Sequence, residues 1–146
     1  MKASELMTSN PECVTREDSL QWAAQIMRDH DTGFLPVVDD RSTMHLNGVI
    51  TDRDITVRAV AEGLIGGRVA DCMSVGSLRT VRPDDGDSDV LRAMQDAQVR
   101  RIPVVDEGER LVGVIAQADI ATHKVSDRKV GETVERISMP GRSRNH

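Results

Sequence analysis

The chain has 146 residues with 24 acidic and 19 basic side chains, which gives a formal net charge of −5. Aromatic residues make up only 1% of it, which argues against RNA-binding modules that stack bases on aromatic platforms. The negative charge argues against a duplex DNA-binding protein. No stretch approaches the ~20 apolar residues of a membrane helix, and the first ten residues lack the apolar core of a secretion signal.

The first half of the chain predicts a strand, a helix and a hairpin, in that order. A short strand is expected around Val14. A helix follows, with Asp18 or Ser19 as its N-cap. Its apolar residues recur at i, i+3, i+4 and i+7, namely Leu20, Ala23, Ala24 and Met27. The runs LPVVD (35–39) and NGVIT (47–51), joined by a polar turn, predict a β-hairpin.

A second helix is expected over Asp52–Glu62, with Gly63 ending it. The segment Gly63–Val69 is rich in glycine but too short and too apolar for a flexible tether. We therefore expect it to link two halves of one module.

The second half of the chain repeats the first. FLPVVD at 34–39 returns as RIPVVD at 101–106, and GVITDRDI at 48–55 returns as GVIAQADI at 113–120. Near the start, ELMTS resembles DCMSV at 71–75. A second amphipathic helix is expected, with Val90, Leu91 and Met94 on its apolar face. Self-similarity at a fixed spacing is the mark of a repeated structural unit.

Each copy therefore predicts the order β-α-β-β-α, led by a short strand around Val14 or Val81. A half with one small sheet and two helices cannot bury both faces alone, so the halves should pack together. The expected fold class is α/β (α+β). The expected boundaries are 2–62 for the first subdomain, 63–69 for a linker, 70–125 for the second subdomain and 126–146 for a basic, partly disordered tail.

This doubled pattern resembles a tandem pair of CBS domains, a family named after cystathionine β-synthase. The resemblance covers roughly residues 2–125. It rests on features that occur twice in order: a hydrophobic-Pro-Val-Val-Asp strand, a Gly-hydrophobic-Ile strand and an Asp three residues past its end. It points to stand-alone bacterial CBS-pair proteins. The resemblance implies pseudo-twofold symmetry, a homodimer, and clefts between the halves that bind AMP, ADP or ATP, and in some members NAD or S-adenosylmethionine.

The run Thr51-Asp52-Arg53-Asp54 can hold a nucleotide on chemical grounds. Thr51 ends a strand and Asp54 lies in the next helical turn, where backbone N–H groups and the helix dipole favour phosphate. The Asp54 carboxylate can accept both hydroxyls of a ribose, and Arg53 offers a forked donor for phosphate. The alternative is structural, with Thr51 as an N-cap and Asp54 as a partner of the helix dipole. The resemblance favours the ligand, because CBS domains hold ribose and phosphate with a Thr/Ser-x-x-Asp motif.

The second copy departs from this pattern. Asp119 keeps the ribose carboxylate, but the residues 116–118 read Ala-Gln-Ala where 51–53 read Thr-Asp-Arg. Arg100 and Arg101, which precede the second proline strand, are candidates to replace the lost phosphate donor. The two sites are therefore expected to differ, with Ala116, Arg101 and Asp119 at the second.

Backbone and apolar contacts are expected to hold the adenine, since the chain has almost no aromatic side chains to stack on it. In the first copy these residues are Val14, Phe34 and Pro36. In the second copy they are Val81 and Pro103.

Other signals favour structural interpretations. The acidic cluster Asp85–Asp89 has the D-x-D-x-D spacing of a calcium loop, but lacks the later glycine and glutamate and fits a helix start better. The four histidines show no metal-ligand spacing. Cys13 and Cys72 are interpreted as reduced, buried side chains of a cytoplasmic protein, with a disulfide or a reactive thiol as the alternatives.

The sequence therefore predicts a non-catalytic regulatory module that senses adenosyl nucleotides, with AMP or ATP as the expected ligand class and no required cofactor or metal. No nucleophile or acid–base constellation indicates an enzyme. A ligand-free, dimeric interaction scaffold is the alternative. Residues 124–146, net +3 against net −8 for the rest of the chain, are expected to be a solvated end rather than a DNA-binding arm.

Overall fold

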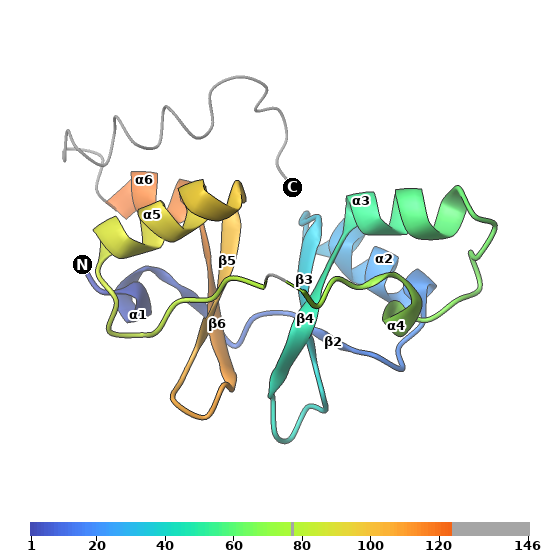
Figure 1. Cartoon of the computed structure of the whole chain (residues 1–146), viewed down its shortest axis with the longest axis horizontal. Helices are drawn as coiled ribbons and strands as arrows, with labels where there is room; N and C mark the ends of the chain where they lie inside the picture. The colour runs from blue at the N-terminus through green and yellow to red at the C-terminus, as the bar shows by residue number, and fades with distance from the viewer. Residues whose placement is uncertain (77, 124–146) are drawn as a thin grey trace. The chain divides into compact units, whose positions relative to one another are not determined.

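The computed structural model describes residues 1–76 and 78–123, so the expected basic tail at 126–146 lies outside the described residues. The chain divides into two compact units. The first unit is Glu12–Leu78, and the second unit is Met1–Pro11 together with the chain from Arg79 (Figure 1). Within the described residues each unit holds a three-stranded sheet and its own core. The expected mixed α/β fold of two small repeated subdomains is confirmed.

The first unit follows the predicted order. Its elements are β2 (Val14–Thr15), α2 (Leu20–Asp29), β3 (Phe34–Val38), β4 (Leu46–Thr51), α3 (Asp52–Ile55), the π-helical turn η1 (Thr56–Val60) and α4 (Val69–Cys72). The central strand β3 runs parallel to β2 and antiparallel to β4. The predicted hairpin of β3 and β4 is therefore present.

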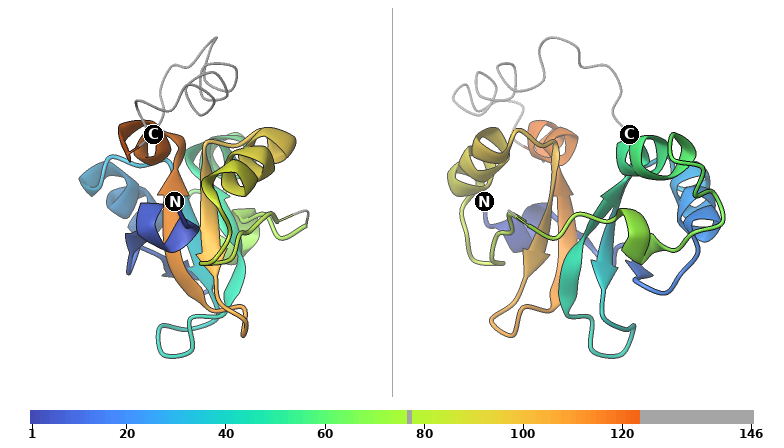
Figure 2. Two further views of the ribbon diagram at one scale, coloured as in Figure 1. Left: turned by 90° about the vertical axis from the view of Figure 1, so that its left-hand side faces the viewer. Right: turned by 45° about the vertical axis from the view of Figure 1, so that its right-hand side comes forward.

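The second unit repeats this plan with elements from both ends of the sequence. They are α1 (Ala3–Leu6), β1 (Thr8–Ser9), α5 (Asp87–Ala97), β5 (Arg101–Val105), β6 (Leu111–Ala116) and α6 (Gln117–His123). The central strand β6 runs antiparallel to both β1 and β5. The short strand expected around Val81 is present as a single parallel bridge to Val104. Figure 2 shows each hairpin turning at the end of its sheet away from α3 or α6.

The helix of residues 20–29 begins where the sequence predicts. Ser19 is its N-cap, because its Oγ accepts a hydrogen bond of 3.0 Å from the Trp22 N–H. The second helical run of this unit begins as an α-helix and passes into the π-helical turn η1. Gly63 follows with a φ of +75°, a left-handed conformation that glycine adopts at low cost.

Aliphatic side chains, with some methionines and Cys72, form the two cores. Each fully buried one contributes roughly 1.5–3 kcal/mol relative to an exposed one. In the first unit helix α2 contributes Leu20, Ala23, Ile26 and Met27. In the second unit helix α5 contributes Val90, Leu91 and Met94. These are the apolar faces predicted from helical spacing, except that Ala24 is exposed and Ile26 takes its place.

One glycine in each hairpin has no room for a side chain. A Cβ on Gly48 would lie 2.8 Å from Met73 Cε, and one on Gly113 would lie 2.8 Å from Met7 Cγ. The methionines belong to the repeated sequences DCMSV and ELMTS. The repeat of these short sequences thus reflects one packing contact that each unit makes.

The compact units group the chain differently from the sequence repeat, whose expected bounds of 2–62, 63–69 and 70–125 stay a prediction. Ala3 and Leu6 are buried in the core of the second unit, and Thr8 pairs with Val114 of its sheet, so the first eleven residues belong there. The expected linker is part of the first unit, because Val69 is a core residue and its N–H donates to the Asp18 carbonyl at 2.8 Å. The boundary between the units falls instead between Leu78 and Arg79.

Candidate functional site

Thr51 stands at the junction of β4 and α3. It has an extended backbone (φ −118°, ψ 165°), and its Oγ1 accepts a hydrogen bond of 3.1 Å from the Asp54 N–H. In return, Asp54 Oδ2 accepts one of 2.9 Å from the Thr51 N–H. This reciprocal pair is a capping box. The structural role weighed for Thr51 from the sequence is therefore real.

The capping box does not use all of the polar capacity of these two residues. Each carboxylate oxygen of Asp54 has two lone pairs, and a threonine hydroxyl that accepts one bond still carries its own proton to donate. Both residues are half-buried rather than sealed in the core. The same contacts that cap the helix hold a carboxylate and a hydroxyl in fixed positions at its N-terminus.

Asp52 lies against Gly33. The Asp52 N–H donates to the Gly33 carbonyl at 2.9 Å, and Asp52 Oδ1 accepts from the Arg53 N–H at 2.9 Å. A Cβ on Gly33 would lie 2.6 Å from Asp52 Oδ2. The glycine is therefore needed for the carboxylate to sit here, a contact that sequence reasoning missed. Arg53 is exposed on the first turn of α3.

The remaining candidates of the first unit lie on the strands beside this junction. Phe34 is the cross-strand partner of Thr51, and Pro36 is the partner of Val49. Val14 pairs with Val37 on the other side of β3. Phe34 is half-buried, whereas Val14 is fully buried in the core. The strand order therefore brings Phe34, but not the Val14 side chain, to the surface beside Thr51.

The second unit keeps the carboxylate and loses the hydroxyl. Asp119 Oδ2 accepts a hydrogen bond of 3.0 Å from the Ala116 N–H, which reproduces the Asp54–Thr51 contact. The Gln117 N–H donates to the Arg100 carbonyl at 2.8 Å, in the place of the Asp52–Gly33 contact. Arg101 is the cross-strand partner of Ala116. The structure thus brings Ala116, Arg101 and Asp119 together at one junction.

Val81 and Pro103, the residues predicted beside the adenine in the second unit, are buried. Val81 is 4% exposed and belongs to the core. Its N–H donates to the Pro103 carbonyl at 3.1 Å, and its own carbonyl accepts from Val105 at 2.9 Å. These contacts give Val81 a structural role. Pro103 is buried opposite Val114.

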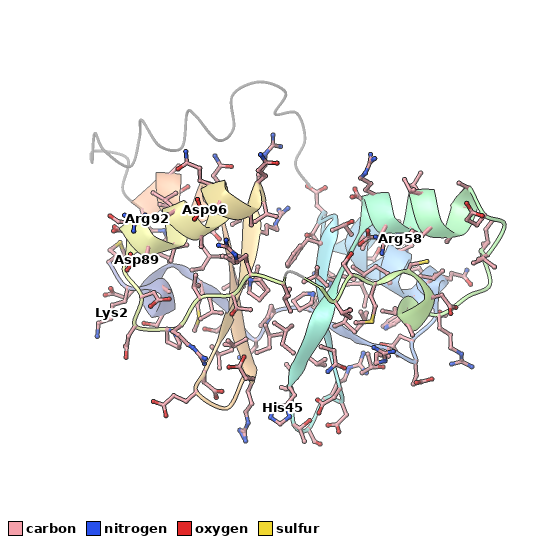
Figure 3. The ribbon with its side chains drawn as sticks, viewed as in Figure 1. Lys2, His45, Arg58, Asp89, Arg92 and Asp96 are labelled. Carbon is pink, nitrogen blue, oxygen red and sulfur yellow. The ribbon has the colours of Figure 1, made fainter. Side chains whose placement is uncertain are left out.

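A residue not singled out from the sequence lies one helical turn after Asp54. Arg58, on η1, donates through Nη1 to the carbonyls of Cys72 and Met73 at 3.2 and 3.3 Å. It also lies 3.5 Å from Ser74 Oγ (Figure 3). Its position four residues after Asp54, on the same helical run, is the signal that could have drawn attention to it.

Both cysteines are free thiols. Burial raises the pKa of the Cys72 thiol, the carboxylates of Asp71 and Asp54 raise it further, and the Arg58 guanidinium opposes them. Burial also raises the pKa of Cys13. Cys72 is fully buried and Cys13 is half-buried, so the prediction of buried side chains holds fully for Cys72 only.

The acidic cluster before α5 has the structure of a helix start. Asp85 Oδ2 accepts from the Arg82 N–H at 2.8 Å, and Gly86 is the N-cap residue of α5. Asp87 and Asp89 lie in the first turn of this helix. Among residues 1–76 and 78–123 no three His, Cys, Asp or Glu side chains are grouped to hold a metal ion. In the same part of the chain no helix is long and apolar enough to cross a membrane.

Two units built alike, each with a carboxylate fixed at a strand-to-helix junction, define a paired-repeat protein of the CBS type. The family model of the CBS domain matches residues 3–60 and 69–126. The chain therefore belongs to the CBS domain family and carries a tandem pair of these domains.

Two relatives consist of little more than such a pair. The chain is 36% identical to hypoxic response protein 1 of Mycobacterium tuberculosis over 139 residues, 94% of either chain. It is 35% identical to the CBS domain-containing protein YhcV of Bacillus subtilis over 133 residues, 90% of this chain and 91% of that one. The crystal structure of hypoxic response protein 1, described with two coordinated zinc ions, has a TM-score of 0.76 over 84% of this chain and 98% of that one.

Solved structures with adenosyl ligands share the fold. CBSX2 in complex with AMP is 27% identical, with a TM-score of 0.74 over 87% of this chain and 98% of that one. The CBS pair of protein MJ0100, in complex with 5′-methylthioadenosine and S-adenosylmethionine, is 25% identical. Its TM-score is 0.72 over 86% of this chain and 97% of that one.

Proposed function

We propose that this protein is a non-catalytic regulatory module whose two CBS domains bind an adenosyl nucleotide of the AMP, ADP or ATP class. One observation carries the proposal: each unit fixes an aspartate carboxylate against a backbone N–H at its strand-to-helix junction, Asp54 at 2.9 Å and Asp119 at 3.0 Å. Such a carboxylate is fixed in position and still has lone pairs that can accept the two hydroxyls of a ribose.

Each polar group at the first junction is proposed to bind one part of the nucleotide. The Asp54 carboxylate accepts the two ribose hydroxyls through lone pairs that the Thr51 N–H leaves unused. The Thr51 hydroxyl donates its proton to a phosphate or ribose oxygen. The positive end of the dipole of the helical run Asp52–Val60 and the Arg53 guanidinium stabilise the negative charge of the phosphate.

The two sites bind unequally under this proposal. At the second junction Ala116 offers no hydroxyl, so Asp119 holds the ribose alone while Arg100 and Arg101 supply charge for the phosphate. At the first junction Asp52 and Asp54 place two carboxylates beside one Arg53. The second site should therefore depend more strongly on the number of phosphates, and more steeply on salt, than the first.

The relatives support the ligand class. CBSX2 carries AMP in its crystal structure, and the MJ0100 pair carries two sulfur-containing adenosyl compounds. Ligand binding would act by favouring one arrangement of the two domains over others, which changes what a partner protein meets. We further propose that the protein works as a homodimer in the cytoplasm, where its free thiols stay reduced.

Thermal unfolding tests this proposal directly. The protein is melted alone and with AMP, ATP, NAD or S-adenosylmethionine, beside Asp54→Ala and Asp119→Ala. A ligand at ~100 times its Kd stabilises the folded state by about 2.7 kcal/mol, which raises Tm by roughly 5 °C or more in a domain of this size. The proposal expects a rise for at least one nucleotide that one of the two variants abolishes.

Asp29→Ala is the matched control, because Asp29 is an exposed carboxylate that contacts its helix neighbour Arg28. It should leave the nucleotide response unchanged. No rise with any of the four compounds would contradict the proposal. It would favour the alternative of a ligand-free interaction scaffold. The loss of the Thr51 hydroxyl in the second copy, where Ala116 stands, agrees with that alternative.

A further inference from the structure

Arg58 fastens the segment through which the chain leaves the first unit. Helix α4 is a single turn, so the carbonyls of Cys72 and Met73 at its end have no partner within the helix. Arg58 Nη1 donates to both, at 3.2 and 3.3 Å. Since a guanidinium is planar and permanently charged, it can bind several carbonyl oxygens at one helix end. We call Cys72–Gly76 the exit segment, because Leu78 is the last residue of this unit.

The sheet fastens the exit segment a second time. Ser74 forms an antiparallel bridge with Val49, with the Ser74 N–H donating to Val49 at 2.8 Å and the Val49 N–H donating to Ser74 at 3.1 Å. Gly48 allows this approach, since a side chain there would meet Met73. Beyond Ser74 the Val75 side chain is 57% exposed.

The two residues that hold the exit segment, Val49 and Arg58, lie on either side of the motif Thr51–Asp54 in the sequence. Val49 lies two residues before Thr51, and Arg58 lies four residues after Asp54 on the same helical run. The run is unusual at Arg58, because the Ala61 N–H donates to the Thr56 carbonyl at 3.0 Å in π-helical fashion. Single π-helical turns occur preferentially at functional sites. The printed contact of Arg58 Nη1 with the Cys72 carbonyl, at 3.2 Å, joins this run to the end of α4.

In the described part of the second unit, the residue at the matching position does not make this connection. Its counterpart of Ser74 is Thr8, which pairs with Val114 as Ser74 pairs with Val49. The position of Arg58, however, is taken by His123, and the His123 ring instead contacts the Asp119 carbonyl of its own helix at 2.8 Å. The fold therefore repeats without the arginine, so the contact is not required to build a unit of this kind.

We propose that Arg58 is a positioning residue that couples a ligand on Thr51–Asp54 to the exit segment. This inference rests on the proposed nucleotide binding. It adds the contacts through which binding changes the stability of the exit segment. A ligand that binds the first turn of α3 stabilises the helical run in its docked position. Through Arg58 the docked run holds Cys72 and Met73, and the ligand thereby favours the fastened form of the exit segment over the loosened one.

Amide hydrogen exchange at Ser74, Val75 and Gly76, measured by NMR with and without AMP or ATP, tests this coupling. In the unaltered protein a saturating nucleotide should slow these amides about tenfold. In Arg58→Ala the slowing should fall below about twofold, while the Kd from calorimetry changes less than about threefold. Arg58→Gln, whose side chain is shorter and carries no charge, should behave similarly and remains informative should Arg58→Ala not fold.

Arg68→Ala is the matched control. Arg68 also fastens α4 through a backbone contact, its Nη1 donating to the Glu17 carbonyl at 2.8 Å, but at the opposite end of the helix. This variant should keep the full nucleotide-dependent slowing.

The outcomes separate the two proposals. If neither AMP nor ATP binds the unaltered protein, the proposed function is wrong, and the proposed coupling, which depends on it, is wrong as well. If a nucleotide binds without slowing the exit segment, the coupling alone is wrong. It is equally wrong if Arg58→Ala speeds exchange with and without nucleotide by the same factor, because Arg58 would then be purely structural.

Discussion

Thr51 and Asp54 each accept a hydrogen bond from the backbone N–H of the other, at 3.1 and 2.9 Å. The same two contacts that begin a helix therefore also orient the hydroxyl and the carboxylate proposed to hold a nucleotide. Stability and binding depend on the same pair of side chains at this junction, so changes here should affect both.

Thr51→Ala should lower stability and weaken nucleotide binding together. The loss of an N-cap hydroxyl costs about 1 kcal/mol, which lowers Tm by roughly 3–6 °C in a domain of this size. Melting without ligand measures the first effect and titration calorimetry the second. Thr51→Ser keeps the oxygen and should retain most of both. If the Ala and Ser variants behave alike, the Thr51 hydroxyl contributes neither to stability nor to nucleotide binding.

Ala116→Thr should add to the second unit what it lacks. A threonine Oγ here can accept from the Asp119 N–H, as Thr51 accepts from Asp54, and should stabilise the unit by about 0.5–1 kcal/mol. It should also tighten nucleotide binding at this junction. Urea unfolding and calorimetry measure the two effects. Ala116→Val, which adds similar bulk without an oxygen, is the control, and a gain of the same size in it would point to packing instead.

Gly33→Ala should destabilise the first unit through a contact with Asp52. The new Cβ would lie 2.6 Å from Asp52 Oδ2, so the carboxylate must move. Asp52→Gly should relieve this, and the double variant should be more stable than the sum of the single changes implies. A double-mutant cycle from urea unfolding measures the coupling. Strict additivity would show that the two residues do not conflict.

Cys13 should react with a thiol reagent well before Cys72. Cys72 is fully buried whereas Cys13 is half-buried, and burial raises the pKa of both thiols. One equivalent should therefore react at moderate rate near pH 8, and the second only as fast as the protein unfolds. Cys13→Ser should remove the faster phase. Loss of the slow phase instead would reverse the assignment.

Asp40 should make stability depend on pH below about 4. The hydroxyl of Ser42, followed by the backbone N–H groups of Thr43 and Ser42, lowers the pKa of Asp40 from 3.8 to about 2. A depressed carboxyl pKa stabilises the folded state above its unfolded value, and this contribution is lost as the pH falls through about 2. The difference in urea midpoint between the unaltered protein and Asp40→Asn should therefore be largest near neutral pH and shrink toward pH ~2. A constant difference would contradict it.

The sequence predicts most of the fold because each element carries its own local signal. Ser19 before an apolar helical face, and two β-branched runs around a polar turn, identify α2 and the first hairpin without tertiary information. The repeat then extends this prediction to the second hairpin. The matched positions of Asp54 and Asp119 followed from the same comparison.

Other features depend on contacts between distant residues, which no local pattern contains. ELMTS and DCMSV are alike, so nothing in their sequence decides that Thr8 pairs with Val114. Gly33 and Asp52, which are in contact, lie 19 positions apart in the sequence. Arg58 and Cys72, which share a hydrogen bond, lie 14 positions apart. The burial of Val81 could not be predicted either, because two residues of a short strand do not show whether it is buried.

The placement of the first eleven residues has a consequence for synthesis on the ribosome. The first unit is continuous, from Glu12 to Leu78, and can fold as soon as it has emerged. Ala3 and Leu6, translated earlier, find their core only when β5, β6 and α5 have followed. The nascent chain must therefore keep an unpartnered apolar N-terminal segment available throughout most of translation.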